Sequence, residues 1–387
     1  MLFGIVSKNN YARNKIAEWI EIHIFRSVNV NQGYIPKTLS DSIEKTQFVA
    51  LCKLNKYEER ALQVNHIFRK RVLDELSNQH QKHVLKLNQL EKFKKIDQTI
   101  ISNNGKAVKI LIENFIKKNN MPILMDDIKN SDFLAPLSSL NETLTHLVRD
   151  YNVSFYRNET LPIVEYILNT ISQNVKNFDS ETTDILIPGS GLGRVSYEIS
   201  KNFPDVPVTS VEYSDLMYIG NHLIYFANET INISPWVIEY SNHLSLEGQL
   251  KSFPVNCQDF TKPENLKIEN ADFRKYKLPV NQKQKKQLII ITVFFVDTAE
   301  NIFEYMDKIE SYKRTYETVH WINLGPLKYG TRPKVVLTAE EFSQLRADRG
   351  WKDIKYACSP EEEIGYVTNT VGLYKGKYSL LKFHSIL

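Results

Sequence analysis

The sequence has 387 residues, of which 42% are hydrophobic and 24% are charged, so it can form a folded chain with a large core. Its 49 basic and 45 acidic residues leave a net charge of +4, too small to indicate a nucleic-acid partner. The three cysteines are far apart and fit no metal or disulfide spacing. No apolar stretch is long enough to cross a bilayer, and the start, MLFGIVSKNN, is too short for a signal peptide. We therefore expect a soluble, cytoplasmic protein, with the nucleus as a second location, and no membrane or metal partner.

The amino-terminal part of the chain is predicted to be helical. Between about 55 and 118, apolar residues recur at steps of three and four, which is typical of helices with one buried face. Asn104-Gly105 is expected to break this helical stretch, and a further helix is expected near 141–151. We interpret 1–140 as a helical region that packs on a second domain, in preference to an independent coiled coil.

Residues 141–387 show a different pattern, in which strand-like runs alternate with helical ones. The helical segments are 194–202, 216–228 and 301–312, and the apolar run 288–296 suits a parallel strand buried on both faces. This alternation predicts an α/β fold with a doubly wound, mostly parallel, Rossmann-like sheet. The expected strands lie in TDILIPG, VPVTSVEYS, QLIIITVFFVDTA, VHWINLGPL, WKDIKYACS and YSLLKFHSI.

The stretch ILIPGSGLGRVSYEIS places a glycine-rich turn between a predicted strand and a predicted helix. Gly189, Gly191 and Gly193 allow close backbone approach to a ligand, and Glu212 ends the next strand, 23 residues after Gly189. An acid there typically binds the hydroxyl groups of a ribose. The dinucleotide fingerprint would have its last glycine where Arg194 stands, so the pattern favours S-adenosyl-L-methionine. A nicotinamide or flavin site, and a structural turn without a ligand, are the alternatives.

Four phrases in the second half resemble one known family. LIPGSGLGRVSYEIS, SPWVIEYSNHLSLEGQ, FFVDTAENIFEYMDKI and WINLGPLKY, in this order, are similar to the carnosine N-methyltransferase family, a group of class I methyltransferases. The resemblance runs from about residue 144 to the end of the sequence. It implies S-adenosyl-L-methionine as the cofactor and methyl transfer as the reaction.

The resemblance also implies which residues contact the cofactor. Asp272 would bond the adenine amino group and Phe273 would supply a ring face. Arg149 would pair with the carboxylate of the cofactor, His146 replaces a family glutamine, and Val293 replaces a cysteine at a contact made by the backbone. The full set is His146, Arg149, Gly189, Gly191, Gly193, Glu212, Asp272, Phe273 and Val293.

The acceptor side matches the family less well. The carnosine-binding aspartate of the family matches Asp297, and a pocket tyrosine matches Tyr378, whereas a pocket histidine and a second tyrosine are replaced by Gly330 and Gly376. A simpler interpretation of Asp297 is that it caps the helix TAENIFEYM. Two further tyrosines, Tyr240 and Tyr329, are candidates for the pocket wall.

The predicted function is S-adenosyl-L-methionine-dependent N-methylation of an imidazole nitrogen of carnosine, giving anserine, or of a related histidine-containing dipeptide. Asp297 would either fix the imidazole tautomer or hold the ammonium group of the dipeptide. The alternatives are a different acceptor, such as a protein histidine or a small amine, and a non-catalytic adaptor that keeps the fold. The resemblance further implies that two copies pair through the helical region.

Overall fold

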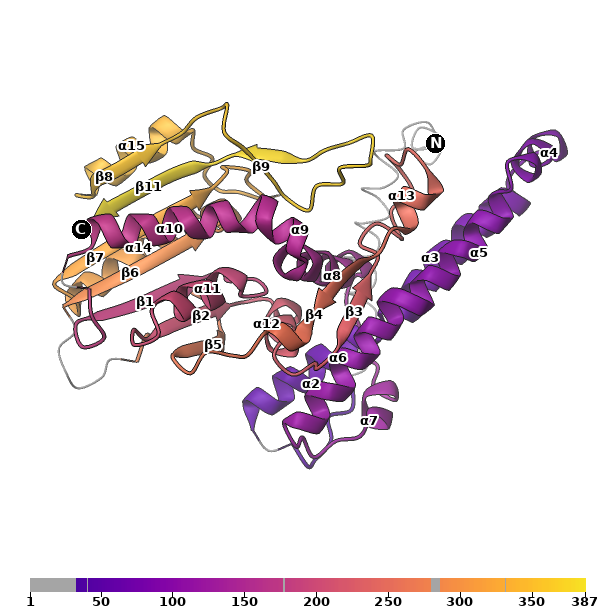
Figure 1. Ribbon diagram of the computed structural model, residues 1–387, viewed down its shortest axis with the longest axis horizontal. Coiled ribbons are helices and arrows are strands. Elements are labelled where there is room, and N and C mark those ends of the chain that lie inside the picture. Colours follow the sequence, from indigo (N-terminus) through magenta and orange to yellow (C-terminus); the bar gives the residue numbers. More distant parts are fainter. Residues whose placement is uncertain (1–32, 40, 177, 280–285, 331) are drawn as a thin grey trace.

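A computed structural model describes residues 33–39, 41–176, 178–279, 286–330 and 332–387, so the stretch MLFGIVSKNN lies outside the described residues. An amino-terminal set of helices is followed by an α/β sheet with its own helices (Figure 1). None of the described helices is long and apolar enough to span a membrane. The amino-terminal helices are α2 (Ser42–Asn55), α3 (Tyr57–Asp74), α4 (Asn78–Lys86), α5 (Gln89–Thr99), the π-helix η3 (Ile100–Gly105), α6 (Lys106–Lys118), α7 (Met125–Lys129) and α8 (Leu137–Tyr151).

The main sheet has seven strands, all parallel except β11, which runs antiparallel to both of its neighbours. The doubly wound, mostly parallel sheet predicted from the sequence is therefore confirmed. The chain runs outward from β1 to β2 and β5, then returns to the other side of β1 to form β6, and such a reversal opens a ligand crevice at the carboxyl ends of the strands. In spatial order the strands are β5 (Leu266–Asn270), β2 (Val208–Glu212), β1 (Thr183–Pro188), β6 (Gln287–Val293), β7 (Thr318–Gly325), β11 (Leu381–Ile386) and β8 (Lys352–Ala357).

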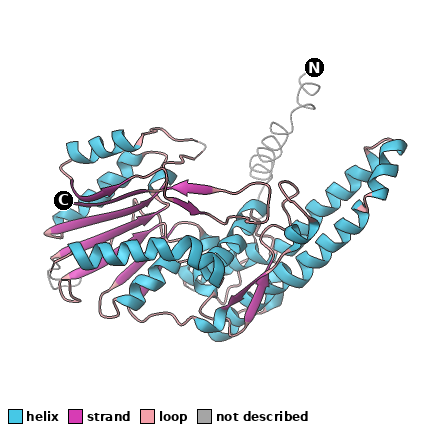
Figure 2. Ribbon diagram, turned by 45° about the horizontal axis from the view of Figure 1, so that its top comes forward, coloured by secondary structure: helices cyan, strands magenta, loops and turns pink. Residues whose placement is uncertain are grey.

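Helices cover both faces of this sheet (Figure 2). Successive side chains of a strand point to opposite faces, so Ile185 and Ile187 of β1 pack with α10 and α11, whereas Leu186 packs with α14 and α15. Both faces are therefore apolar, which explains the uninterrupted apolar runs of β1 and β6. The covering helices are α10 (Leu161–Asn174), α11 (Arg194–Asn202), α14 (Ile302–Ser311) and α15 (Ala339–Asp348). Two further helices are short: α9 (Val153–Phe155) and α13 (Leu246–Leu250).

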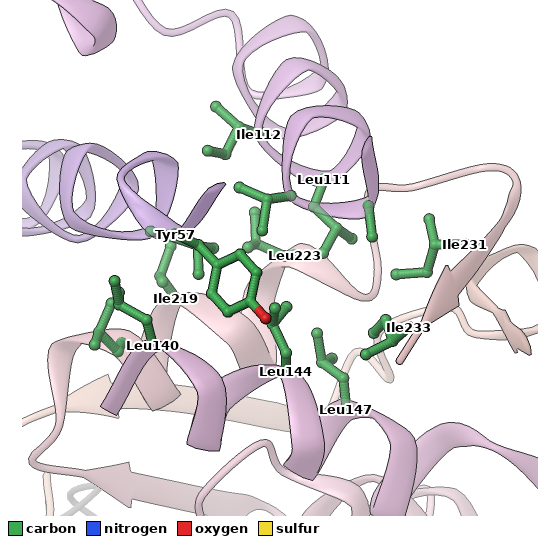
Figure 3. Packing of buried hydrophobic residues seen from close by; sticks show 14 of the residues in the cluster. Tyr57, Leu111, Ile112, Leu140, Leu144, Leu147, Ile219, Leu223, Ile231 and Ile233 are labelled. Carbon is green, nitrogen blue, oxygen red and sulfur yellow. The ribbon is translucent and has the colours of Figure 1, made fainter. Parts of the chain in front are cut away.

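The amino-terminal helices share one hydrophobic cluster with parts of the α/β domain (Figure 3). Tyr57 of α3 and Leu111 of α6 lie in the same fully buried cluster as Leu147 of α8 and Ile233 of β3. The expected division between 140 and 141 falls inside α8 and stays a prediction. The other elements in this cluster are α12 (Asp215–Leu223), β3 (Thr230–Ile233) and β4 (Phe253–Asn256), the last two forming an antiparallel pair.

The helix break expected at Asn104-Gly105 is wrong, because η3 continues directly into α6. The buried Asn104 side chain donates to the Tyr57 hydroxyl at 2.7 Å and to the Ser234 carbonyl at 3.0 Å. A Cβ on Gly105 would meet a carboxylate oxygen of Glu58 at 2.2 Å. The Asn-Gly pair therefore serves a close helix–helix contact and a buried hydrogen-bond network.

Helices α3 and α5 form a helical hairpin that projects from the body of the molecule, with α4 at its tip (Figure 1). The Asn65 side chain joins the two helices by donating to the Phe93 carbonyl at 2.8 Å and to Asp97 at 2.7 Å. The expected packing of the helical region on the second domain holds for α2 and α6. It is wrong for the outer half of the hairpin, where Leu73 and Leu85 are exposed.

Candidate functional site

A cavity of about 630 Å³ lies at the carboxyl ends of β1, β2 and β6. Its volume is in the range of about 300–1,000 Å³ that is common for small-molecule sites. Gly193, which the sequence also assigned to the cofactor site, does not line it. The other eight predicted cofactor residues do line it: His146, Arg149, Gly189, Gly191, Glu212, Asp272, Phe273 and Val293. Their contact with a cofactor stays a prediction.

The glycine turn between β1 and α11 requires glycine for two physical reasons. Gly189, Gly191 and Gly193 have φ values of 62°, 55° and 80°, in the left-handed region that side chains with a Cβ rarely adopt. A Cβ on Gly189 would also meet the Phe295 ring at 2.2 Å, whereas a Cβ on Gly191 would meet nothing within 4 Å. The backbone at Gly191 is therefore open to the cavity.

Glu212 ends β2 and is held in place by the backbone around it. Its two carboxylate oxygens accept hydrogen bonds of 2.8 Å from the N–H groups of Gly191 and Ser214. Burial raises the pKa of Glu212, and these backbone donors lower it. Each carboxylate oxygen can accept a further hydrogen bond, so Glu212 can still bind hydroxyl groups from within the cavity.

Arg149 of α8 places a buried guanidinium in the cavity wall. Its Nη1 donates to Asp150 at 3.1 Å, and its Nε lies 3.8 Å from a carboxylate oxygen of Glu159. Within the described residues, Nε and Nη2 have no hydrogen-bond partner although both are buried. Unpaired buried donors of this kind are suited to an anionic group such as a carboxylate.

His146 lies one helical turn before Arg149 and is neutral. Burial, together with the charge of Arg149, lowers the pKa of His146 to about 3. Its Nε2 lies 3.2 Å from the hydroxyl of Tyr366, which also lines the cavity. The guanidinium of Arg149 is 4.6 Å from the centroid of the Tyr366 ring, a cation–π contact. Tyr366 was missed in the sequence because it lies in an irregular stretch far from the glycine turn.

Asp272 and Phe273 follow β5 and line the cavity together. The Asp272 carboxylate is bound by Arg274 through Nε at 3.0 Å and Nη2 at 2.7 Å, and this contact lowers the pKa of Asp272. The Phe273 ring packs edge-on against Phe295 and Tyr305. Arg274 and Tyr305 were not expected at the site, and Tyr305 reaches it because the fold brings α14 beside the turn after β5.

Arg194 occupies the place where a dinucleotide site would have its last glycine. Its Nη1 donates to the Asp150 carbonyl at 2.9 Å and its Nε to Glu198 at 2.8 Å. The guanidinium lies 3.6 Å from the Tyr156 ring centroid, and further cation–π contacts involve Tyr151, Tyr197 and Phe260. This buried side chain fastens the start of α11 to α8.

Asp297 is buried just beyond β6, in the short 3₁₀-helix η6 (Val296–Thr298). Its Oδ2 accepts a hydrogen bond of 3.0 Å from the backbone N–H of Lys328, and burial raises the pKa of Asp297 to about 6. The cap of α14 is Asn301, whose side chain accepts from Phe303, so the helix-cap interpretation of Asp297 is wrong. Asp297 does not line the cavity itself.

Phe294 connects the cavity with the predicted acceptor residues. Its ring lines the cavity and lies 4.8 Å from the ring centroid of Tyr366 and 5.9 Å from that of Tyr378. Phe294 has a φ of 50°, an uncommon value for a bulky residue that is often found at functional sites. We call Phe294, Asp297, Tyr366 and Tyr378 the acceptor end of the site. Tyr378 belongs to β10 (Lys377–Ser379), which pairs with β9 (Glu363–Gly365).

The remaining acceptor candidates do not line the cavity. The Tyr240 hydroxyl donates to Asn65 and its ring stacks on Phe68, so the pocket-wall role expected for Tyr240 is wrong. The Tyr329 hydroxyl bonds the backbone of Leu337, and Tyr329 does not line the cavity. Gly330 is exposed, and a Cβ there would meet nothing within 4 Å.

Comparison with known proteins gives a consistent result. A family model described as carnosine N-methyltransferase matches residues 128–387. An uncharacterized protein of Saccharomyces cerevisiae is 38% identical over 269 residues, which cover 66% of this chain and 58% of the yeast protein. A carnosine N-methyltransferase of Schizosaccharomyces pombe is 25% identical over 297 residues, covering 70% of this chain and 76% of that protein. This chain therefore spans little more than half the length of the first relative.

Solved structures with related folds are more distant. A S-adenosylmethionine-dependent methyltransferase from Aquifex aeolicus has a TM-score of 0.37 and 11% identity, covering 63% of this chain and 97% of that one. Magnesium protoporphyrin IX methyltransferase from Synechocystis, with bound S-adenosylhomocysteine, also has a TM-score of 0.37, with 9% identity, covering 64% and 94%. Likeness at this level carries no argument about the chemistry of this chain.

Proposed function

The chain belongs to the carnosine N-methyltransferase family, and on this premise we propose that it is a S-adenosyl-L-methionine-dependent N-methyltransferase. Its acceptor is an imidazole nitrogen of carnosine or of a related histidine-containing dipeptide. The observation that carries the proposal is the Glu212 carboxylate, held by Gly191 and Ser214 in a cavity that Arg149 also lines.

The residues that line the cavity fit S-adenosyl-L-methionine. Glu212 would accept hydrogen bonds from the ribose hydroxyls, and the unpaired donors of Arg149 would take the carboxylate. Asp272 and Phe273 would hold the adenine at the other end. When bound, the cofactor supplies a methyl group that its sulfonium charge has already activated.

Asp297 supplies a hydrogen-bond acceptor at the acceptor end. Because its pKa is about 6, the carboxylate is mostly ionised at neutral pH and can accept a hydrogen bond from a ring N–H. This hydrogen bond fixes the tautomer in which the opposite ring nitrogen carries its lone pair. The pKa of Lys328 is raised, chiefly by its hydrogen bond to Tyr378 and to a smaller extent by the charge of the Asp297 carboxylate, so a cation already lies near Asp297. We therefore favour the tautomer role over binding of a substrate ammonium group at Asp297.

Aromatic rings around the acceptor end would exclude water from the transfer. The rings of Phe294, Tyr366 and Tyr378 pack against one another, with centroids 4.8 to 6.0 Å apart. Excluding water prevents loss of the methyl group by hydrolysis and strengthens the polar contacts that orient the acceptor.

A different acceptor is the second candidate, and Gly330 supports it. The open space at Gly330 could admit a larger group, such as a histidine within a protein. No observation favours the adaptor alternative, since the glycine turn and Glu212 keep the geometry of a ligand site. Cytoplasmic location and pairing of two copies stay predictions.

A methyl-transfer assay with radiolabelled cofactor tests the proposal. The purified full chain should transfer label to carnosine and to other histidine-containing dipeptides, and transfer to β-alanyl-alanine, which has no ring nitrogen, should be absent. Label on small amines or protein histidines, with none on dipeptides, would favour the second candidate. No transfer to any acceptor despite cofactor binding would contradict the proposal.

A further inference from the structure

Lys328 places a cation at the acceptor end of the site. Its backbone N–H donates to Asp297, while its Nζ donates to the hydroxyl of Tyr378 at 2.8 Å. One residue therefore contacts both predicted acceptor residues, through its backbone and through its side chain. The Tyr378 ring in turn packs edge-on against Phe294, which lines the cavity.

The ammonium group of Lys328 has no close carboxylate partner in the part of the chain that the structure describes. The neighbouring Lys377, by contrast, pairs with Glu363 at 3.0 Å. A lysine whose ammonium ends on a neutral hydroxyl can still bind an anion, because an ammonium group has three donors. Its exposed position leaves room for a ligand group to approach it.

We propose that Lys328 is a specificity-determining residue that binds the carboxylate of the acceptor. This assignment rests on the proposed function and names the acceptor class: imidazole compounds with a free carboxylate on the same histidine residue. In such compounds the carboxylate is only a few bonds from the ring. A ring bound to Asp297 would therefore place the carboxylate within reach of the long Lys328 side chain.

The same charge sets the orientation of the acceptor. The positive charge of Lys328 repels the ammonium group at the other end of a dipeptide and attracts the carboxylate. The amino end of the dipeptide would then point away from Asp297 and Tyr378. Recognition would depend on the carboxylate and would be insensitive to blocking of the amino group.

The test compares three probes in the methyl-transfer assay: carnosine, carnosine amide, which lacks the negative charge, and N-acetylcarnosine, which lacks the positive charge. Wild-type protein should prefer carnosine over its amide by roughly tenfold or more in kcat/KM, as expected for a charge-assisted hydrogen bond. N-acetylcarnosine should be used about as well as carnosine. In Lys328→Met the preference for carnosine over the amide should fall close to one, and Lys328→Arg should retain most of it.

The ratio between the two probes separates charge recognition from a structural role. If Lys328 only held Tyr378 in place, Lys328→Met would lower kcat/KM for carnosine and for its amide by the same factor. The ratio between the two would then stay as in the wild type. Lys377→Met, next to Tyr378 but paired with Glu363, is the matched control and should keep the wild-type ratio. Cofactor affinity, measured by calorimetry, shows that each variant is folded.

The outcomes also separate this assignment from the proposed function. Equal use of carnosine and its amide by the wild type, or an unaltered ratio in Lys328→Met, would overturn the role of Lys328 alone. If the wild type methylates carnosine amide well but does not methylate N-acetylcarnosine, the dipeptide binds in the reverse orientation. This result would also overturn the role of Lys328. Methylation of none of the three probes would contradict the proposed function itself, and this assignment with it.

Discussion

The ring of Phe295 lies directly against the backbone of Gly189, so that a Cβ on Gly189 would meet the ring carbon Cδ2 at 2.2 Å. This contact joins the glycine turn after β1 to the end of β6, where the acceptor end begins. The cofactor turn and the acceptor residues are therefore held in a fixed relation by one aromatic ring.

Gly189→Ala should weaken cofactor binding by at least about tenfold. The alanine would have to keep a positive φ, which costs about 1–2 kcal/mol, and would also displace the Phe295 ring. Calorimetric titration with S-adenosyl-L-methionine measures the effect. Gly330→Ala is the control, since its Cβ would enter open space. Unaltered affinity in a folded Gly189→Ala protein would show that the turn does not contact the cofactor.

Glu212→Ala should also lower cofactor affinity by at least about tenfold. Hydrogen bonds to a charged group are worth roughly 1.5–3 kcal/mol each, and the ribose would lose its acceptor. The control is Glu269→Ala on the adjacent strand β5, where Glu269 pairs with Lys267 at 2.6 Å. If Glu212→Ala and Glu269→Ala bind S-adenosyl-L-methionine equally well, Glu212 does not contact the cofactor.

Asp297→Asn should reduce kcat by roughly 10² with little effect on cofactor affinity, because the amide no longer orients the ring as a charged acceptor. In the wild type, protonation of Asp297 as the pH falls through about 6 should lower activity. Protonation of the acceptor imidazole, which has a pKa of about 6.5, should lower the activity further. Below these pKa values the methyl-transfer rate of the wild type should therefore fall by about a hundredfold for each unit by which the pH is lowered, and that of Asp297→Asn by about tenfold.

A pH–rate profile from pH 4.5 to 8, at saturating cofactor, distinguishes these slopes. The acceptor carboxylate is ionised throughout this range, so it adds no step of its own. If the wild type and Asp297→Asn lose activity with the same slope at acid pH, protonation of Asp297 does not affect the reaction. Collapse of cofactor affinity in Asp297→Asn would show that the residue belongs to the cofactor side.

Gly330→His should lower the KM for carnosine several-fold. The resemblance places a pocket histidine at this position, and a restored hydrogen bond is worth about 0.5–1.5 kcal/mol. The backbone at Gly330 does not have a positive φ, and the space around it is open, so the structure can accept the side chain. Gly330→Leu, which fills the space without a donor, is the control. A wild type that prefers another acceptor by orders of magnitude, with no gain in Gly330→His, would indicate a pocket shaped for that acceptor.

Local sequence patterns were sufficient to predict most of the sheet, the glycine turn and Glu212, whereas the other cofactor residues were predicted from the family resemblance. The glycine turn, Glu212 and the strands β1, β2, β6 and β7 each leave a signal within a few residues, because buried parallel strands are uniformly apolar. β5 was missed because it is short and only alternately buried, at the edge of the sheet. The β3–β4 pair was missed because it packs on the amino-terminal helices and not on the sheet.

The parts of the site that the sequence did not indicate depend on distant contacts. Tyr366 reaches His146 across 220 residues, and Tyr305 reaches Phe273 from α14. The cation at Lys328 is visible in the sequence, but its contact with Tyr378 is not, because 50 residues separate the two. The roles of such residues can be recognised only from the three-dimensional structure.

The shared hydrophobic cluster has a consequence for the order in which the protein can fold during synthesis. Its members run from Leu39 to Cys257, and Asn104 bonds Ser234 over 130 residues. The amino-terminal helices leave the ribosome before β3 and β4, so the part of their apolar faces that packs on these strands has no partner until both have been made. Until then these faces remain available to chaperones, and a ribosome stalled before residue 230 would carry a chain whose first helices cannot complete their packing.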